Sequence, residues 1–258
     1  MPIHPNDIPH LLAFWGFQEP AGVPRRAQGQ YPYLLHEMAG PVTRVDGGLF
    51  GPWAAELQHQ QWFCAPRATA PALDIHGPSA QVSVVAWVQR HRKPNVECEA
   101  VAGVWNETQK RRQYCLFLDL QIHDSADQVC GHVSATGGPT DGHRWCMDAA
   151  IGATPVPCDQ PRWRCIGFTY DGTHARAYLD GRLDVREKLN PYLYPGGLFD
   201  GGADGADFTV GAVYRGGAMG NWFVGRLAGL AIFDAALDDS AMQQLAAWCD
   251  APCRIKPE

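Results

Sequence analysis

The chain has 258 residues, of which 46% are hydrophobic and 19% charged, and its formal net charge is −6 at pH 7. This hydrophobic content is ordinary for a protein with a packed core and argues against disorder. An acidic chain lacks the basic surface that favours nucleic acid or an anionic membrane, so we expect neither as a partner. The length fits a single all-β domain over residues 1–258, because sandwiches of roughly 200–250 residues are common as one domain.

The amino-terminal segment MPIHPNDIPH has neither the basic nor the apolar stretch of a signal peptide. No apolar run approaches the roughly 20 residues that would span a bilayer, so membrane insertion is not expected. We therefore predict a cytoplasmic protein whose nine cysteines are mostly buried, reduced thiols. The alternative is an exported protein whose leader is absent from this sequence, with Cys146–Cys158 and Cys249–Cys253 as the disulfides to check.

Apolar and alternating runs predict a chain composed mainly of strands. In chain order they lie over 10–17, 33–37, 82–90, 98–105, 112–123 and 129–134, with a further pair of strands between 49 and 63. Residues 135–160 form an insertion, and residues 189–208 form a Tyr- and Gly-rich loop. Because ordering long loops costs conformational entropy, both are expected to line a site or to pair two copies of the chain. Asp238 or Asp239 is the expected N-cap of a short terminal helix.

The clearest structural signal lies in residues 162–187, which read as two strands and two tight turns. Asp171-Gly172-Thr173 joins the strands, and Asp180-Gly181 forms the second turn. Asp-Gly pairs supply the positive φ that such turns need. Side chains alternate with a period of two on either side of the first turn, which predicts an antiparallel hairpin.

The pattern W-x-x-x-x-F-T-Y-D-G-x-x-x-x-x-Y-L-D-G in this hairpin resembles the core hairpin of laminin-G-like domains, in the concanavalin A-like lectin/glucanase group. Residues 10–17, 82–90 and 208–245 resemble other strands of that family in the same order. The resemblance implies a jelly-roll sandwich of two antiparallel sheets with a short C-terminal helix. This scaffold carries lectins, adhesion modules, glycoside hydrolases and polysaccharide lyases, so the resemblance alone does not decide the function.

The predicted strand 112–123 has an apolar face and an unusually polar face that includes Gln113, Asp119, Gln121 and His123. In the fold that the resemblance implies, such a face lies on the concave surface where glycans bind. The adjoining hairpin adds an aromatic ring, an amide, a carboxylate and cations. Aromatic rings cover the apolar face of a sugar, and planar amides or carboxylates bind its hydroxyls.

We therefore predict a carbohydrate-binding groove. Its expected ligand-binding residues are Trp105, Asn106, Glu107, Arg111, Gln113, Asp119, Gln121, His123, Tyr192 and Trp222. Six residues from loops that flank the last strands would line the groove if they converge on the Trp105 hairpin: Tyr192, Tyr194, Tyr214, Arg215, Asn221 and Trp222. The alternative for residues 105–112 is a hydrated hairpin with Trp105 packed inward.

Two other functional classes remain open from the sequence. Gln121-Ile122-His123 resembles a motif of one alginate-lyase family, although the other two strands of those enzymes are missing. Glu97 and Glu99 could form a carboxylate pair on one strand face, as glycoside hydrolysis requires. The absence of a complete catalytic set favours binding over a hydrolase or lyase. A structural or assembly module without sugar binding is the third reading, with the 135–160 insertion as its homo-oligomer contact.

Calcium is the one cofactor that the sequence suggests. The segment 199–207 places carboxylates among glycines, whose carbonyls are free to wrap around a hard cation. Calcium is also common in the fold that the resemblance implies. The expected ligands are Asp200, Asp204 and Asp207. The alternative is a glycine-rich turn whose aspartates cap their own backbone. A second group of acidic residues and histidines, within 123–143, matches no established zinc spacing.

Overall fold

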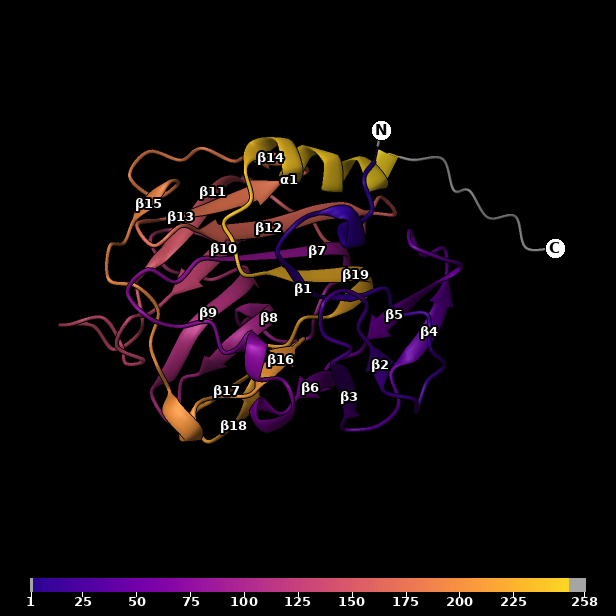
Figure 1. Cartoon of the computed structure of the whole chain (residues 1–258), viewed down its shortest axis with the longest axis horizontal. Coiled ribbons are helices and arrows are strands. Elements are labelled where there is room, and N and C mark those ends of the chain that lie inside the picture. Colours follow the sequence, from indigo (N-terminus) through magenta and orange to yellow (C-terminus); the bar gives the residue numbers. More distant parts are fainter. Residues whose placement is uncertain (1, 251–258) are drawn as a thin grey trace.

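The computed structural model describes residues 2–250, which form two β-sheets packed face to face (Figure 1). We call the nine-stranded sheet the first sheet. Its order is β14 (Arg182–Leu183), β13 (His174–Leu179), β12 (Arg164–Tyr170), β7 (Val82–Arg90), β19 (Gly225–Phe233), β5 (Trp53–Leu57) and β4 (Thr43–Asp46), with β1 (Leu11–Trp15) on β19 and β15 (Tyr192–Leu193) on β13. Neighbouring strands of this sheet are antiparallel.

The ten-stranded sheet is the second sheet. Its order is β11 (Ala149–Pro155), β10 (Gln128–Val133), β9 (Arg111–Leu118), β8 (Glu99–Asn106), β16 (Phe208–Val210), β6 (Trp62–Ala65), β3 (Leu34–Met38) and β2 (Arg25–Arg26), with β17 (Val213–Arg215) and β18 (Ala218–Gly220) beside β8. Consecutive strands along this order are antiparallel, and only the short contact of β17 with β8 is parallel. The expected sandwich of two antiparallel sheets is confirmed.

The helices of the described residues are short. The one α-helix is α1 (Asp239–Ala246), and the 3-10 helices are η1 (Pro5–Asp7), η2 (Arg67–Thr69), η3 (Pro71–Leu73), η4 (Gly202–Asp204) and η5 (Ala247–Asp250). Asp238 caps α1 as predicted, because its side chain accepts a hydrogen bond from the backbone N–H of Ala241. Within residues 2–250, no helix is long and apolar enough to cross a membrane.

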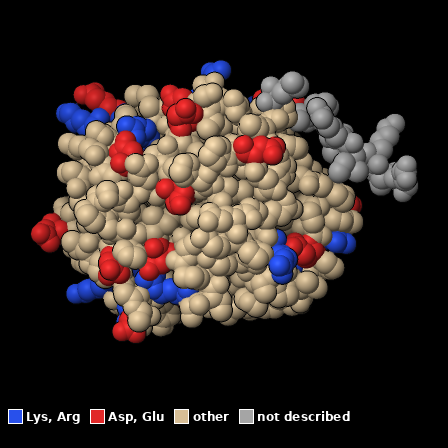
Figure 2. Space-filling model, in the orientation of Figure 1, with Lys and Arg blue, Asp and Glu red and all other residues tan. Residues whose placement is uncertain are grey.

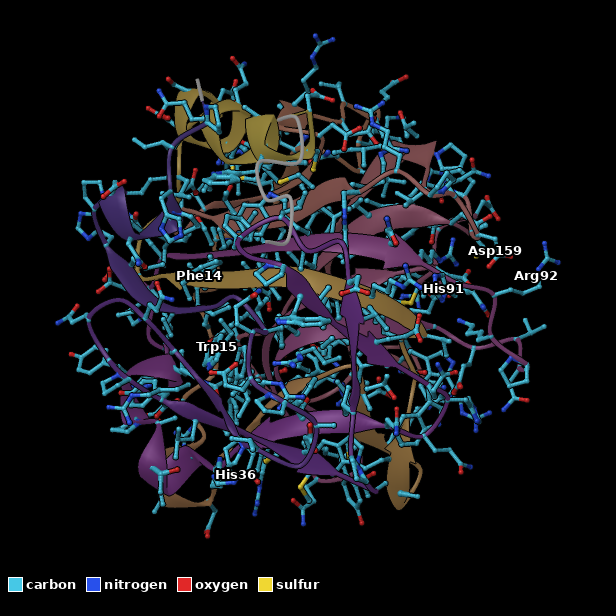
Figure 3. The ribbon with its side chains drawn as sticks, turned by 90° about the vertical axis from the view of Figure 1, so that its right-hand side faces the viewer. Phe14, Trp15, His36, His91, Arg92 and Asp159 are labelled. Carbon is cyan, nitrogen blue, oxygen red and sulfur yellow. The ribbon has the colours of Figure 1, made fainter. Side chains whose placement is uncertain are left out.

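The core lies between the sheets and follows the period-two alternation of the strands. In β1, Trp15 points into this core and stacks on Phe208 of the second sheet, with ring centroids 5.8 Å apart. Its neighbour Phe14 belongs to a separate apolar cluster on the outer face of the first sheet (Figure 3). In the same cluster Met242 and Leu245 of α1 cover that outer face. The first sheet is therefore covered on both faces, and the outer face of the second sheet carries a further buried cluster around Trp105 and Phe117.

The predicted hairpin is confirmed as β12 and β13, followed by β14. At the second turn Asp180 and Gly181 have φ values of 49° and 76°, the two consecutive positive φ angles of a type I′ turn. At the first turn Asp171 Oδ1 accepts hydrogen bonds from the backbone N–H groups of Thr173 and His174, at 2.8 and 2.7 Å. Local turn chemistry therefore fixes this part of the fold.

Three sequence expectations were wrong in detail. The strand expected over 112–123 is β9, which ends at Leu118 because Asp119, Gln121 and His123 adopt positive φ values of 49°, 60° and 50°. The strands between 49 and 63 are not a pair, since β5 belongs to the first sheet and β6 to the second. The insertion 135–160 is not wholly a loop, because it contains β11, which pairs with β10.

The eight cysteines within the described residues are free thiols. The disulfide Cys146–Cys158 considered for an exported protein is therefore not formed. The other pair, Cys249–Cys253, includes a residue outside the described range. Acidic and basic side chains are interspersed on the face shown in Figure 2, and neither charge gathers there into an extended patch.

Candidate functional site

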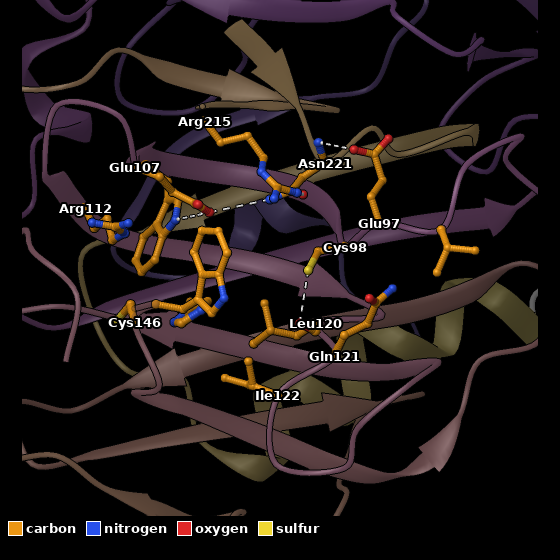
Figure 4. A pocket seen from close by; sticks show the side chains of 14 residues that line it. Glu97, Cys98, Glu107, Arg112, Leu120, Gln121, Ile122, Cys146, Arg215 and Asn221 are labelled. Atoms are coloured by element: carbon orange, nitrogen blue, oxygen red, sulfur yellow. Dashed lines mark hydrogen bonds between the residues drawn. The ribbon is translucent and has the colours of Figure 1, made fainter. Parts of the chain in front are cut away.

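The outer face of the second sheet carries a cleft with a volume of about 230 Å³ (Figure 4). The side chains come from β8, β9, β10 and β17 and from the loops before β8, after β9, before β11 and after β18. The lining residues are Val96, Glu97, Cys98, Trp105, Glu107, Arg112, Leu120, Gln121, Ile122, His132, Trp145, Cys146, Arg215 and Asn221. Strands fix one wall of the cleft, and loops far apart in the sequence complete it.

Trp105 and His132 pack against each other at the base of the cleft, with ring centroids 4.4 Å apart. Burial lowers the pKa of His132 to about 3, so the ring is neutral at physiological pH. Its Nδ1 lies 3.0 Å from the carbonyl oxygen of Asp148, which can only accept, so Nδ1 carries the proton and Nε2 is left as an acceptor. Trp105 is only 1% exposed, so it forms a floor and not an open stacking surface.

Asn221 connects the polar side chains along one wall. Its backbone N–H donates to Glu97 Oε2 at 2.9 Å, its Oδ1 accepts from Arg215 Nη1 at 2.5 Å, and its Nδ2 lies 3.5 Å from Glu107 Oε1. Asn221 has a φ of 55°, which an asparagine tolerates better than most residues. Glu97 Oε1 is buried, lies 3.9 Å from His59 Nε2 and has no hydrogen-bond partner among the described residues. Glu97 therefore carries an acceptor that the described residues leave unused.

Trp145 is the exposed aromatic residue of the cleft. It is 42% exposed, and the guanidinium carbon of Arg215 lies 5.7 Å from its ring centroid. Arg144 Cζ lies 4.7 Å from the same ring. Both guanidinium carbons lie within cation–π range of the ring, and such contacts restrict its orientation. Trp145 therefore presents an apolar surface beside the hydrogen-bonding wall of Asn221.

A β-bulge decides which residue of β9 enters the cleft. Val104 pairs with Tyr114 and Trp105 pairs with Arg112, so Gln113 is an extra residue opposite no partner on β8. Arg112 consequently lines the cleft. Gln113 instead donates to Asp74 Oδ1 at 2.8 Å and is fully buried. The simple alternation expected for this strand placed Gln113 on the polar face, but the side chain that lines the cleft is Arg112.

The structure brings three of the predicted ligand-binding residues together in the cleft: Trp105, Glu107 and Gln121. The residues outside its lining are Asn106, Arg111, Gln113, Asp119, His123, Tyr192 and Trp222. Arg111 donates to Gln109, and Tyr192 donates to Asp148. His123 Nε2 lies 3.0 Å from the carbonyl oxygen of Met147. Arg215 and Asn221 do converge on the hairpin, as the groove hypothesis required.

Sequence reasoning missed Trp145 and Cys146 as cleft residues, although both lie in the long 135–160 insertion that was expected to be functional. Trp145 could have been predicted as a surface residue, because it lies between basic and polar residues in a loop and belongs to no apolar pattern. His132 was not predicted as a cleft residue, because in the sequence it is only one of the side chains that alternate between the two faces of β10. Cys98 lines the cleft too, but its Sγ donates to the Leu120 carbonyl at 3.0 Å, and burial raises its pKa to about 12.

The expected carboxylate pair is divided between two environments. Glu97 lines the cleft, whereas Glu99 is 1% exposed and accepts two hydrogen bonds from Arg90, each at 2.8 Å. Lys93 Nζ lies 3.0 Å from Glu99 as well. Glu99 is therefore held in a buried ion-pair network and is not available as a partner for Glu97.

The predicted calcium ligands do not converge on one point. Asp200 Oδ1 accepts from the backbone N–H of Gly202 at 2.8 Å, and Asp207 Oδ1 accepts from the backbone N–H of Arg67 at 2.8 Å. Asp204 lies in η4 and belongs to no group of metal-ligating side chains among the described residues. The Asp200 contact matches the alternative reading, in which an aspartate caps the backbone of its own turn, whereas Asp207 bonds to a distant segment.

Another group, Asp74, His76 and Asp200, has ligand atoms within 4.8 Å of one another. Asp74 already accepts from Gln113 and forms an ion pair with Arg67, so both of its oxygens are occupied. Calcium requires about six to eight oxygen ligands. This donor set does not fit calcium, and we assign it no role in the site.

No family model and no curated protein sequence matches the chain. Many solved structures share its architecture, among them the following three. Domain 4 of AbnA, a GH43 extracellular arabinanase from Geobacillus stearothermophilus, in complex with arabinotriose, is 18% identical with a TM-score of 0.58, over 92% of this chain and 98% of that one. A Trypanosoma rangeli sialidase mutant displaying trans-sialidase activity is 15% identical with a TM-score of 0.54, over 92% of this chain and 32% of that one. The binding domain of Botulinum neurotoxin DC in complex with SialylT is 9% identical with a TM-score of 0.53, over 94% and 52%.

The fold is a jelly-roll β-sandwich. Identities this low show the architecture alone. The chain spans nearly all of the arabinanase domain, but only about half of the toxin domain and a third of the sialidase. The narrower laminin-G-like assignment stays a prediction.

Proposed function

We propose that the protein binds an oligosaccharide in the cleft on the outer face of the second sheet. The proposal rests on one observation. The exposed ring of Trp145 lies in the same cleft as the hydrogen-bonding groups of Glu97, Arg215 and Asn221, and Glu97 Oε1 has no hydrogen-bond partner among the described residues. An aromatic plate next to fixed acceptors and donors matches a sugar ring, which has an apolar face and a rim of hydroxyls.

The wall and the plate have distinct tasks. Trp145 covers the C–H face of one sugar ring. Glu97 accepts from a ligand hydroxyl, and the exposed amide of Gln121 can both donate and accept. Asn221 holds Glu97 and Arg215 in place through hydrogen bonds of 2.9 and 2.5 Å, so the wall is largely formed before a ligand arrives.

The similar structures support this reading at the level of sugar chemistry. The arabinanase domain was solved in complex with arabinotriose, and the toxin binding domain in complex with SialylT. A laminin-G-like membership of the chain would agree with the same class of ligand. The expected carboxylate pair is absent from the cleft because Glu99 is held in its ion pair with Arg90. The two carboxylates that do line the cleft, Glu97 and Glu107, are both bonded to Asn221, and we assign them to binding.

A glycan array with the purified wild-type protein tests the proposal. We expect binding to a restricted set of glycans, and loss of about tenfold or more in affinity in the Trp145→Ala variant. Trp53→Ala is the matched control, since Trp53 in β5 also lies below an arginine, with Arg44 Cζ 4.0 Å from its ring, but in the other sheet. Chromatography of the bound glycan after incubation separates binding from hydrolysis or lyase activity. Equal binding by Trp145→Ala and wild type, or no binding by either, contradicts the proposal.

A further inference from the structure

Arg25, Arg90 and Arg112 are the buried arginines among residues 2–250, with exposed fractions of 1%, 4% and 4%. Arg25 is paired with Glu37, its Nη2 lying 2.5 Å from Oε1. Arg90 is paired with Glu99 at 2.8 Å and with Asp127 at 2.5 Å. Arg112 takes part in no ion pair among the described residues. Its Nη1 donates to the Gly137 carbonyl at 3.1 Å, and its buried Nε has no partner.

A buried cation without a counter-charge is costly, and proteins normally pair such groups. No negatively charged side chain among the described residues lies close enough to Arg112 to form an ion pair with it. Trp105 offers its ring face, with Arg112 Cζ 5.9 Å from the centroid. His132 is neutral, Cys146 is a protonated thiol whose pKa burial raises to about 11, and Glu107 makes no ion pair with Arg112. Desolvation lowers the pKa of Arg112, and the nearby charge of Glu107 raises it, so this carboxylate offsets only part of the cost of burying the cation.

We propose that the ligand of this cleft is an acidic oligosaccharide, whose carboxylate or sulfate ester completes the unpartnered guanidinium of Arg112. This inference rests on the proposed function and narrows its ligand class. Figure 4 shows Arg112 at one end of the cleft, beside Glu107 and Cys146, with Glu97 and Gln121 toward the other end.

The planar fork of a guanidinium matches the two oxygens of a carboxylate or sulfate. A neutral hydroxyl would satisfy a hydrogen bond but not the charge. Of the two carboxylates of the cleft, Glu97 lies toward the other end and Glu107 lies beside Arg112. An anionic substituent would therefore bind Arg112 against the repulsion of Glu107, while neutral hydroxyls of the same ligand meet Glu97.

Titration calorimetry with matched glycan pairs tests the inference. The pairs are trigalacturonate with its methyl ester, sialyllactose with lactose, and a sulfated chondroitin tetrasaccharide with its desulfated form. We expect at least one acidic member to bind at least about tenfold more tightly than its partner with the acid group masked or removed. Arg112→Gln should remove that difference. Arg111→Gln is the matched control, because its side chain belongs to the adjacent residue, donates to Gln109 and does not line the cleft.

The outcomes separate the two proposals. Equal affinity of the wild type for the acidic and neutral members of every pair, or a preference for the acidic member that persists in Arg112→Gln, overturns the inference and leaves the proposed function intact. No binding of any glycan by the wild type overturns both. Carboxylated and sulfated pairs identify which anion is recognised. The thermal midpoint of Arg112→Gln shows that it is folded, and Arg112→Lys, which keeps the charge but loses the fork, should retain part of the preference for the acidic glycan.

Discussion

The guanidinium of Arg112 is anchored by a neutral group: its Nη1 lies 3.1 Å from the carbonyl oxygen of Gly137. The backbone N–H of Arg112 also donates to this carbonyl, at 3.3 Å. Gly137 therefore orients a buried cation without neutralising it. The carbonyl of this glycine, in the loop after β10, therefore positions the Arg112 guanidinium in the cleft and leaves its charge without a counter-ion.

Replacing the two buried arginines by methionine should change stability in opposite directions. Arg112→Met removes an uncompensated charge and should raise the free energy of unfolding of the ligand-free protein by about 1 kcal/mol. Arg90→Met leaves Glu99 buried without its partner and should lower it by about 3–5 kcal/mol. Urea unfolding at constant pH measures both values. A loss for Arg112→Met as large as that for Arg90→Met would show that Arg112 serves stability and not a ligand.

Gly137→Ala should destabilise the protein more than Gly142→Ala. Both glycines have positive φ, 72° and 77°, so alanine is strained at either position by about 1–2 kcal/mol. A Cβ on Gly137 would also lie 2.3 Å from the Lys110 carbonyl oxygen, whereas a Cβ on Gly142 meets nothing within 4 Å. Differential scanning calorimetry should show the larger drop in melting temperature for Gly137→Ala. Equal drops would mean that the loop moves away from Lys110 without cost.

Acidification should destabilise the protein partly through His132. Its pKa is about 3 in the fold and about 6.5 in the unfolded chain, so the unfolded state binds more protons between these values. The neutral histidine's contribution is fully present above about pH 6.5 and is lost as the pH falls toward 3. Between about pH 6.5 and pH 3, we expect the free energy of unfolding of the wild type to fall more steeply than that of His132→Asn. The two proteins share all other titratable groups, so the difference reports His132. Parallel stability curves would contradict a neutral, buried His132.

The cleft thiols should be unreactive in the native protein. Burial raises the pKa of Cys98 to about 12 and that of Cys146 to about 11, so little thiolate exists at about pH 8. Iodoacetamide labelling followed by peptide mass spectrometry should show both residues unmodified until urea is added. Rapid native labelling of Cys98 would mean that its hydrogen bond to the Leu120 carbonyl does not hold the thiol in place.

Local turn chemistry made the sandwich predictable from sequence. Asp180 and Gly181 dictate their turn through backbone preferences that need no tertiary information. The strand face of β9 was harder to predict, because the bulge at Gln113 depends on the register with β8 and on the contact of Gln113 with Asp74. A one-residue irregularity exchanges the two faces of a strand, which is why Arg112 and not Gln113 enters the cleft.

The loops of the site were the least predictable part. Trp145 reaches the cleft because β11, which follows it, pairs with β10 and fixes the end of the loop. Asn221 bonds to Glu97 and Glu107 from more than a hundred residues away, so no local sequence pattern indicates these contacts. The sequence nevertheless identified Trp105, Glu107 and Gln121, since aromatic and polar side chains at a strand end are unusual for a core.

The crystal structure of the protein with the glycan selected by the array tests the central claim most directly. We predict a sugar ring lying on Trp145, with a hydroxyl bonded to Glu97 and an anionic group at Arg112. A glycan bound on another face of the sandwich, with this cleft left open to solvent, would contradict the account.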